Sequence, residues 1–265
     1  MQQLNNTNLA ILICSFDGYS SLWKPHAEAI NKFWPECPYK IFIGTNHKDS
    51  NIKWITPLKI GNDYGWSDNV RKCITKIDAE YILLFHDDLF ISKAVDNLKL
   101  TKLIGKCINN KWNYLRIHNS PKGNVYYDEL ISEILPESIY RTSVVSAIFK
   151  KEILIDLLRD KENAWDFEIN GSRRSKIYKD FYAVNDDYFS LINTVVKGKA
   201  DPISLKKAKD IGLNVSEVNI PIMNLLEVFL LYSQRLLRKT FFFFLPESLK
   251  SKLIFLKNYI FLHKA

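Results

Sequence analysis

The chain has 265 residues, of which 47% are apolar and 25% are charged, and its net charge is +8. An apolar fraction of this size can fill the core of one large domain, which excludes an intrinsically disordered protein. The basic balance favours an anionic partner such as a nucleotide phosphate, a nucleic acid or an acidic membrane surface.

Apolar runs alternate with helical patterns along most of the chain. Short runs rich in Ile, Leu, Phe and Tyr predict strands over Leu9–Cys14, Tyr39–Gly44, Lys53–Pro57, Tyr81–Phe85, Tyr114–Ile117 and Val144–Phe149. Helical spacing predicts helices over Leu22–Phe33, Asp68–Lys76, Ala94–Cys107 and Glu152–Asp160, with Ser67 as the N-cap of the second. This alternation predicts an α/β fold, a mostly parallel sheet flanked by helices.

The cysteines and the apolar segments of the sequence indicate in which cellular compartment the protein resides. Cys14, Cys37, Cys73 and Cys107 occur without a C-x-x-C pair, which predicts reduced thiols in a cytosolic protein. The uncharged N-terminus leads into an apolar run without a small-residue cleavage site, so we expect no signal peptide. Charges interrupt every apolar window of about 18 residues, so we expect no spanning helix.

Polar side chains follow two of the predicted strands directly. Ser15 and Asp17 follow the first strand, and His86, Asp87 and Asp88 follow the strand Tyr81–Phe85. Ligands of open α/β sheets bind at the carboxyl ends of the strands. Adjacent carboxylates repel each other, and a divalent cation on a diphosphate would relieve that repulsion. The alternative is that Asp87 caps a turn while Asp88 faces solvent.

The His86-Asp87-Asp88 segment at this strand end resembles the Asp-x-Asp motif of GT-A glycosyltransferases, with His86 where the family usually has an acid. The resemblance implies a GT-A-like (Rossmann-like) sheet, a nucleotide-sugar donor in contact with His86 and Asp87, and a divalent metal, Mn or Mg, on Asp88 and Asp87. A metal-independent enzyme is the alternative. The resemblance also implies nucleotide contacts from further residues, which are Ser15, Asp17, Ser67, Asn69 and, for the diphosphate, Arg71. A solvated surface arginine is the alternative for Arg71.

A second acidic cluster, Asp166 and Glu168, follows Trp165. In inverting GT-A enzymes an acid in such a late motif is the general base, so the resemblance implies Glu168 as first choice and Asp166 as second. Apolar walls from Trp165 and Phe167 would raise the pKa of such a carboxylate toward neutrality. The alternative is an amphipathic edge strand with exposed acids.

Two arginines follow in a Gly/Ser-rich segment, Gly171 to Ser175. We expect Arg173 and Arg174 to lie in a loop and to clamp a phosphate or an acidic acceptor, with a mobile basic surface loop as the alternative.

The chain changes character again near its end. We expect a catalytic domain over residues 1–215 and an amphipathic helical segment over residues 216–265. Basic residues beside aromatics and leucines there, including Leu249 to Leu262, are typical of a helix at an anionic membrane surface. Packing on the catalytic domain and a homo-oligomer interface are the alternatives.

The resemblance implies an inverting, hexosyltransferase-like glycosyltransferase. Its partners would be a nucleotide-sugar donor and a glycan or lipid-linked acceptor of bacterial surface polysaccharide or lipopolysaccharide biosynthesis, at the inner face of the cell membrane. We do not expect nucleic acid as a partner, because acidic clusters lie within residues 60–90 and 160–190. A nucleotidyltransferase and a non-catalytic membrane adaptor are further alternatives.

Overall fold

The computed structural model describes residues 8–244. Its centre is a nine-stranded sheet in the order β3-β2-β1-β4-β9-β6-β10-β8-β7. The strands of this sheet are β1 (Leu9–Cys14), β2 (Lys40–Thr45), β3 (Ile55–Lys59), β4 (Tyr81–His86), β6 (Tyr114–Arg116), β7 (Val125–Tyr126), β8 (Ile131–Glu133), β9 (Ala147–Lys150) and β10 (Phe181–Val184). The pairs β1–β2, β1–β4, β2–β3 and β6–β10 are parallel. Strand β9 is antiparallel to both β4 and β6, so β4 and β6 point the same way.

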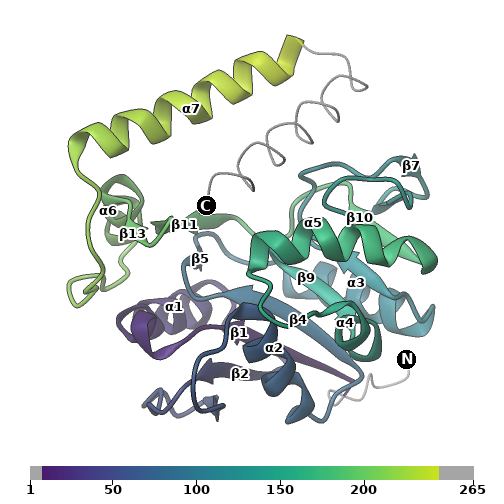
Figure 1. The fold of residues 1–265 in the computed structure, drawn as a ribbon, viewed down its shortest axis with the longest axis horizontal. Helices are drawn as coiled ribbons and strands as arrows, with labels where there is room; N and C mark the ends of the chain where they lie inside the picture. Colours follow the sequence, from purple (N-terminus) through teal and green to yellow (C-terminus); the bar gives the residue numbers. More distant parts are fainter. Residues whose placement is uncertain (1–7, 245–265) are drawn as a thin grey trace.

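Helices cover both faces of this sheet, as Figure 1 shows. They are α1 (Ser20–Phe33), α2 (Trp66–Thr75), α3 (Asn97–Asn109), α4 (Lys151–Leu157), α5 (Ala164–Arg174), α6 (Pro202–Asp210) and α7 (Leu225–Phe244), with the short 3-10 helices η1 (Asp17–Tyr19) and η2 (Ser175–Ile177). The predicted α/β fold, a mixed and largely parallel sheet flanked by helices, is confirmed.

Strand β1 shows why the sheet is buried on both sides. Its alternate residues Ile11 and Ile13 pack with α1 and α3, whereas Leu12 packs with α2, α4 and α5. A strand with both faces covered requires a continuous apolar run, which is the pattern that predicted it. The same holds for β4, whose first five residues are buried.

The segment after β10 contains more regular structure than its polar sequence predicted. Two small antiparallel pairs form there, β11 (Leu191–Asn193) with β5 (Leu89–Ile91) and β12 (Val195–Val196) with β13 (Lys199–Ala200). Together with α6 they bury Phe90 and Val195 against α1. The strands are short and their partners are distant in sequence, so no local periodicity indicates them.

The predicted domain boundary at residue 215 lies inside a segment that packs on α1. Val215 and Val218 lie against the cluster that contains Leu22 of α1, and the backbone of Asn219 donates a hydrogen bond to Ser21. Helix α7 then follows from Leu225. No helix among residues 8–244 is long and apolar enough to cross a bilayer. The predicted stretch Leu249 to Leu262 lies outside the described residues.

Candidate functional site

The site lies where β1 and β4 end side by side. Cys14 is paired with His86 across the two parallel strands, so Ser15 and Asp87 are the next residues out on each strand. The Ser15 hydroxyl donates a short hydrogen bond to Oδ2 of Asp87 and accepts one of 2.6 Å from the indole of Trp23. The structure therefore brings the two predicted strand-end motifs together.

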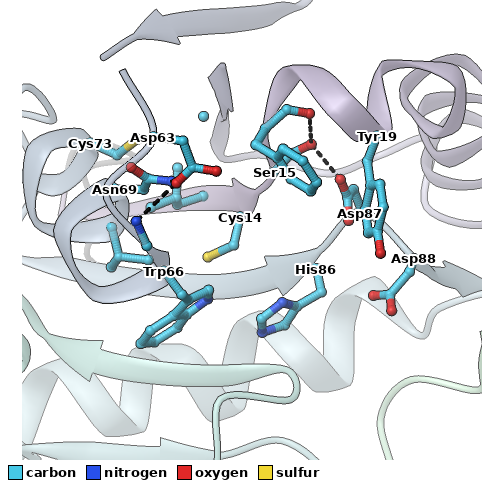
Figure 2. A pocket seen from close by; sticks show the side chains of 15 residues that line it. Cys14, Ser15, Tyr19, Asp63, Trp66, Asn69, Cys73, His86, Asp87 and Asp88 are labelled. Atoms are coloured by element: carbon cyan, nitrogen blue, oxygen red, sulfur yellow. Dashed lines mark hydrogen bonds between the residues drawn. The ribbon is translucent and has the colours of Figure 1, made fainter. Parts of the chain in front are cut away.

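A cavity of about 260 Å³ opens at this edge. Figure 2 shows its walls, in which Ser15, His86, Asp87 and Asp88 come from the strand ends and Trp66 and Asn69 from α2. The further lining residues are Leu12, Cys14, Phe16, Tyr19, Gly44, Asp63, Gly65, Val70 and Cys73. The walls are aromatic and apolar with polar atoms at intervals, which is typical of small-ligand sites.

The two aspartates diverge. Asp87 is directed toward Ser15 while Asp88 is directed away from it (Figure 2). Burial, followed by the charge of Asp88, raises the pKa of Asp87 well above its ordinary value, and burial raises the pKa of Asp88 to about 6. The main chain of Asp88 is fixed, because its carbonyl oxygen accepts hydrogen bonds of 2.8 and 2.9 Å from the backbone N and the hydroxyl of Thr194. Asp88 is therefore the carboxylate positioned to meet a ligand.

His86 is a neutral side chain in this site. Burial lowers its pKa to about 4, although the backbone of Val144 opposes the shift. Its ring stacks on Trp66 with centroids 6.3 Å apart, and its Nε2 is buried without a hydrogen-bond partner among the described residues. A neutral imidazole supplies no charge for a metal or a ribose in the way an acid would.

Several buried polar atoms around the cavity have no hydrogen-bond partner among residues 8–237, where side chains are described. They include the indole Nε1 of Trp66, Oδ1 of Asn69 and the hydroxyl of Ser67. Native proteins rarely leave such atoms unpaired, because each one costs desolvation free energy. Trp66 and Asn69 line the cavity, so a polar ligand there would supply the missing partners.

Sequence reasoning did not identify Asp63 as a site residue. Its Oδ1 accepts hydrogen bonds of 2.9 Å from the backbone of Gly65 and 2.8 Å from the amide of Asn69. Gly65 has a φ of +109°, which an L side chain rarely adopts, and this turn starts α2. Only the fold shows that this turn borders the cavity.

Glu168 lies on α5, close to the same cavity. Its Oε1 accepts a 2.8 Å hydrogen bond from the Ser143 hydroxyl and one of 2.9 Å from the backbone of Val144. Burial raises the pKa of Glu168, and these two bonds oppose the shift. Since the Val144 backbone also influences His86, and Phe167 packs on Trp66 at 5.2 Å, α5 adjoins the strand end of β4.

His118 is a second residue that sequence reasoning missed. It follows β6, whose end lies at the same edge of the sheet as the end of β4, and its Nε2 lies 3.4 Å from the Ser143 hydroxyl. Burial lowers its pKa to about 4. No motif in the sequence marks this histidine, because its neighbours in space come from other elements.

The segment around Trp165 is helix α5 and not the edge strand that was the alternative interpretation. Asn163 caps the helix and Asp166 completes a reciprocal capping box with it. Asp166 is therefore half-buried at the start of the helix, and Trp165 is exposed. Of the two residues expected to form an apolar wall for Glu168, Phe167 is buried and Trp165 lies largely in solvent.

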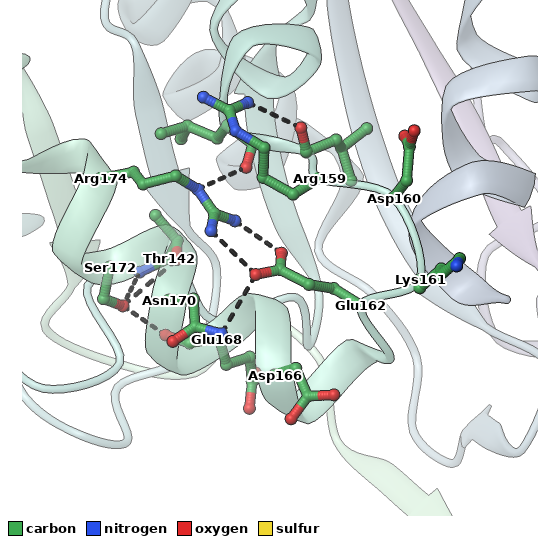
Figure 3. Close-up of polar contacts among 12 residues, drawn as sticks. Thr142, Arg159, Asp160, Lys161, Glu162, Asp166, Glu168, Asn170, Ser172 and Arg174 are labelled. Carbon is green, nitrogen blue, oxygen red and sulfur yellow. Dashed lines mark hydrogen bonds and ion pairs between the residues drawn. The ribbon is translucent and has the colours of Figure 1, made fainter.

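Arg173 and Arg174 lie in the last turn of α5, so their predicted loop is wrong. The Arg174 guanidinium bonds to both carboxylate oxygens of Glu162, at 2.8 and 2.6 Å, and to the carbonyl of Leu157. Figure 3 shows the Arg174 guanidinium facing the Glu162 carboxylate beside α5. The Arg174 guanidinium thus donates its hydrogen bonds to groups of the protein itself.

Three further predicted residues have structural contacts. Asp17 accepts hydrogen bonds from the backbone of Asn46 and His47, at 2.9 and 3.0 Å, and so ties η1 to the end of β2. Arg71 donates a 2.8 Å bond to the carbonyl of Leu158, outside the cavity lining. Ser67 is not the N-cap of α2, because the helix begins at Trp66 after Gly65.

A divalent metal fits this site only in part. Among the described residues no group of three His, Cys, Asp or Glu side chains could hold a metal ion. Asp87 is bonded to Ser15, so Asp88 is the one carboxylate of the pair that is oriented to bind a cation. Mg²⁺ commonly binds one or two carboxylates and completes its coordination with substrate phosphates and water, an arrangement that Asp88 would suit.

Comparison with solved structures finds distant likenesses. S. aureus TarS 1-349 in complex with UDP-GlcNAc matches at 11% identity and a TM-score of 0.47, over 69% of this chain and 57% of that chain. The complex of the same fragment with UDP matches at 11% identity and a TM-score of 0.48, over 79% of this chain and 67% of that chain. HddC from Yersinia pseudotuberculosis matches at 12% identity and a TM-score of 0.48, over 77% of this chain and 98% of that chain. This chain thus spans less than two thirds of the TarS fragment with UDP-GlcNAc.

No protein-family model and no curated protein matches the sequence. Identities this low with TM-scores below 0.5 say nothing of what this chain binds or catalyses. The assignment of a function therefore depends on the geometry of the site.

Proposed function

We propose that this protein is an inverting glycosyltransferase that uses a nucleotide-sugar donor. The observation that supports this best is that two carboxylates lie near the carboxyl end of β4. Asp88 lines the cavity, and Glu168 on α5, outside the lining, has one oxygen anchored by Ser143 and Val144. The first suits the diphosphate side of a donor, and the second suits proton removal from an acceptor hydroxyl.

The donor would bind with its nucleoside in the cavity. Asn69 and Trp66 offer an unpaired acceptor and an unpaired donor, and Tyr19 and Phe16 offer aromatic surface. The diphosphate would then lie toward Asp88. A divalent metal held by Asp88 would neutralise charge on the leaving nucleoside diphosphate.

The acceptor hydroxyl would lose its proton to Glu168. Two hydrogen bonds fix Oε1, and no hydrogen bond among the described residues is made to Oε2, so Oε2 is the oxygen available to take the proton. Burial raises the pKa of Glu168, which makes it a stronger base near neutral pH. The acceptor oxygen then bonds to the anomeric carbon as the bond to the diphosphate oxygen breaks. One displacement with one base inverts the anomeric configuration.

A panel of thermal-shift measurements tests whether the protein binds a nucleotide-sugar donor. The full chain is heated with UDP-, GDP-, CDP- and dTDP-sugars, with and without Mn²⁺, and a selective ligand raises Tm by mass action. An Asn69→Ala variant should lose the shift, whereas Asn110→Ala, on the exposed end of α3, should keep it. A panel with no shift for any nucleotide sugar would contradict the proposal, and a shift with nucleoside triphosphates alone would favour a nucleotidyltransferase.

The acceptor class is a further part of the proposal. We propose a glycan or lipid-linked hydroxyl of a surface polysaccharide. Nuclear magnetic resonance of the glycosylated product reports the anomeric configuration, and retention would contradict Glu168 as the base of a single displacement.

A further inference from the structure

Helix α7 has an apolar face that nothing in the described structure covers. Leu225 is 90% exposed, Phe229 is 66% exposed and Leu230 is 47% exposed, and Leu226 is exposed beside them. These four residues recur at helical spacing on one side of α7, which Figure 1 shows projecting beyond α6 and the sheet. We call them the outer face of α7. Contiguous apolar surface of this kind marks a binding surface.

The opposite side of α7 is fixed to the body of the protein. Glu227 forms an ion pair with Lys199, and the Tyr232 hydroxyl donates a 2.8 Å hydrogen bond to Asp201. Asp201 is fully buried, and Arg235 lies 3.7 Å from it. The outer face is therefore held in one orientation by contacts made on the inner side of the helix.

These contacts lead directly to the candidate site. The backbone of Asp201 donates a 2.8 Å hydrogen bond to the carbonyl of Thr194, and the backbone of Thr194 donates one of 2.8 Å to the carbonyl of Asp88. Two backbone hydrogen bonds thus connect Asp201, the residue that anchors α7, with the main chain of Asp88 after β4. A surface bound to α7 would be held at a fixed position relative to Asp88.

Charge indicates what binds there. Residues 197–265 contain twelve Lys and Arg against five Asp and Glu, which accounts for nearly all of the net charge of +8. Four of these five acids form ion pairs with basic residues: Asp201, Asp210, Glu217 and Glu227. A second copy of the chain would place two strongly basic segments against each other, which like charges oppose. An anionic lipid surface complements both the apolar face and the charge.

We infer that the outer face of α7 docks on an anionic lipid surface, with the apolar side chains in the headgroup boundary and the basic residues near the lipid phosphates. This does not depend on the proposed glycosyltransferase activity. It gives the sequence-based expectation of membrane contact a defined surface and four named residues.

Vesicle co-sedimentation of the full chain tests this inference. Vesicles of phosphatidylcholine alone are compared with vesicles of phosphatidylcholine and phosphatidylglycerol, at low and high salt. We expect binding to the anionic vesicles only, and weaker binding at high salt because salt screens charge. Replacing both Leu225 and Phe229 by Ser should lower the partition coefficient about tenfold or more.

The matched control is Leu98→Ser, since Leu98 is 82% exposed on α3, away from α7. It should bind vesicles as the wild type does. Equal binding of the wild type to both kinds of vesicle, or unchanged binding of the double variant, would overturn the inference. A third outcome would also overturn it: the wild type is a dimer by light scattering, the double variant is a monomer, and neither binds vesicles. The thermal-shift experiment with nucleotide sugars uses no vesicles. A failure of the proposed glycosyltransferase function can therefore be told apart from a failure of the membrane inference.

Discussion

The hydroxyl of Ser143 donates a 2.8 Å hydrogen bond to Oε1 of Glu168, and this bond favours the ionised carboxylate in a buried setting. Ser143 precedes β9, whereas Glu168 belongs to α5, so the contact joins two elements at the edge of the sheet. Its consequence is that Glu168 is oriented by the fold before any substrate binds.

Replacing Glu168 by Gln should abolish proton removal while leaving the shape of the site. We expect kcat for transfer to fall about a hundredfold to ten-thousandfold, with the donor thermal shift unchanged. Asp166→Asn is the matched control, because Asn163 remains the N-cap and the new amide keeps an acceptor oxygen, so only a charge near the helix N-terminus is lost, at a cost of about 1 kcal/mol or less. If both variants lose activity equally, Glu168 is not the base.

Replacing Ser143 by Ala should change the pH dependence of transfer. The hydrogen bond from Ser143 lowers the pKa of Glu168, so its loss raises that pKa further. The acidic limb of the profile of kcat against pH should therefore move to higher pH. Ser138→Ala, on an exposed serine bonded to Asn124, should leave the profile in place. A lower kcat with an unmoved limb would mean that Ser143 is only structural.

Donor affinity should weaken as the pH falls through about 6. The pKa of Asp88 is about 6 in the free protein, and a protonated carboxyl no longer binds a cation. Calorimetric titration of the nucleotide sugar with Mn²⁺ between pH 5 and 8 measures this, and Asp88→Asn should remove the dependence. Asp186→Asn, on an exposed aspartate after β10, should retain it. Affinity that rises on acidification would instead indicate metal-free contact with the diphosphate, where a charged Asp88 is repulsive.

Arg174→Ala should lower stability and not donor affinity. The bidentate bonds to Glu162 are largely buried, and losing one partner leaves the other charge uncompensated, at a cost of about 2 to 4 kcal/mol. Urea denaturation measures the loss. Donor affinity at a temperature where the variant is folded should equal that of the wild type, and a selective loss of affinity would restore the phosphate-clamp interpretation.

His26→Phe should reduce acid destabilisation. His26 is buried against Phe85 and Phe90, and burial lowers its pKa from 6.5 to about 4. A group with a lowered folded pKa contributes stability above its unfolded pKa, and that stability is lost as the pH falls toward the folded pKa. For His26 the window is pH 6.5 to about 4, and the loss is about 3 kcal/mol. Denaturation at several pH values measures it, and an unchanged acid limb in His26→Phe would contradict the prediction.

Local and periodic sequence patterns were sufficient to predict the elements that depend on them. Continuous apolar runs predicted β1 and β4, because a strand buried on both faces needs them. Since ligands of such sheets bind at strand ends, Ser15 and Asp88 could be located from order alone. Glu168 was named from its motif; in the structure it lies on α5 and is bonded to Ser143 and Val144, outside the lining of the cavity.

The roles that depend on distant partners are visible only in the folded chain. Asp87 and Asp88 are adjacent in sequence, yet a bond to Ser15 turns one away and leaves the other at the ligand side. Arg174 looked like a phosphate ligand until the fold placed Glu162 against it. His118 joins the site through a strand pairing that no local pattern specifies, since sheet register is set by contacts between segments far apart in the chain.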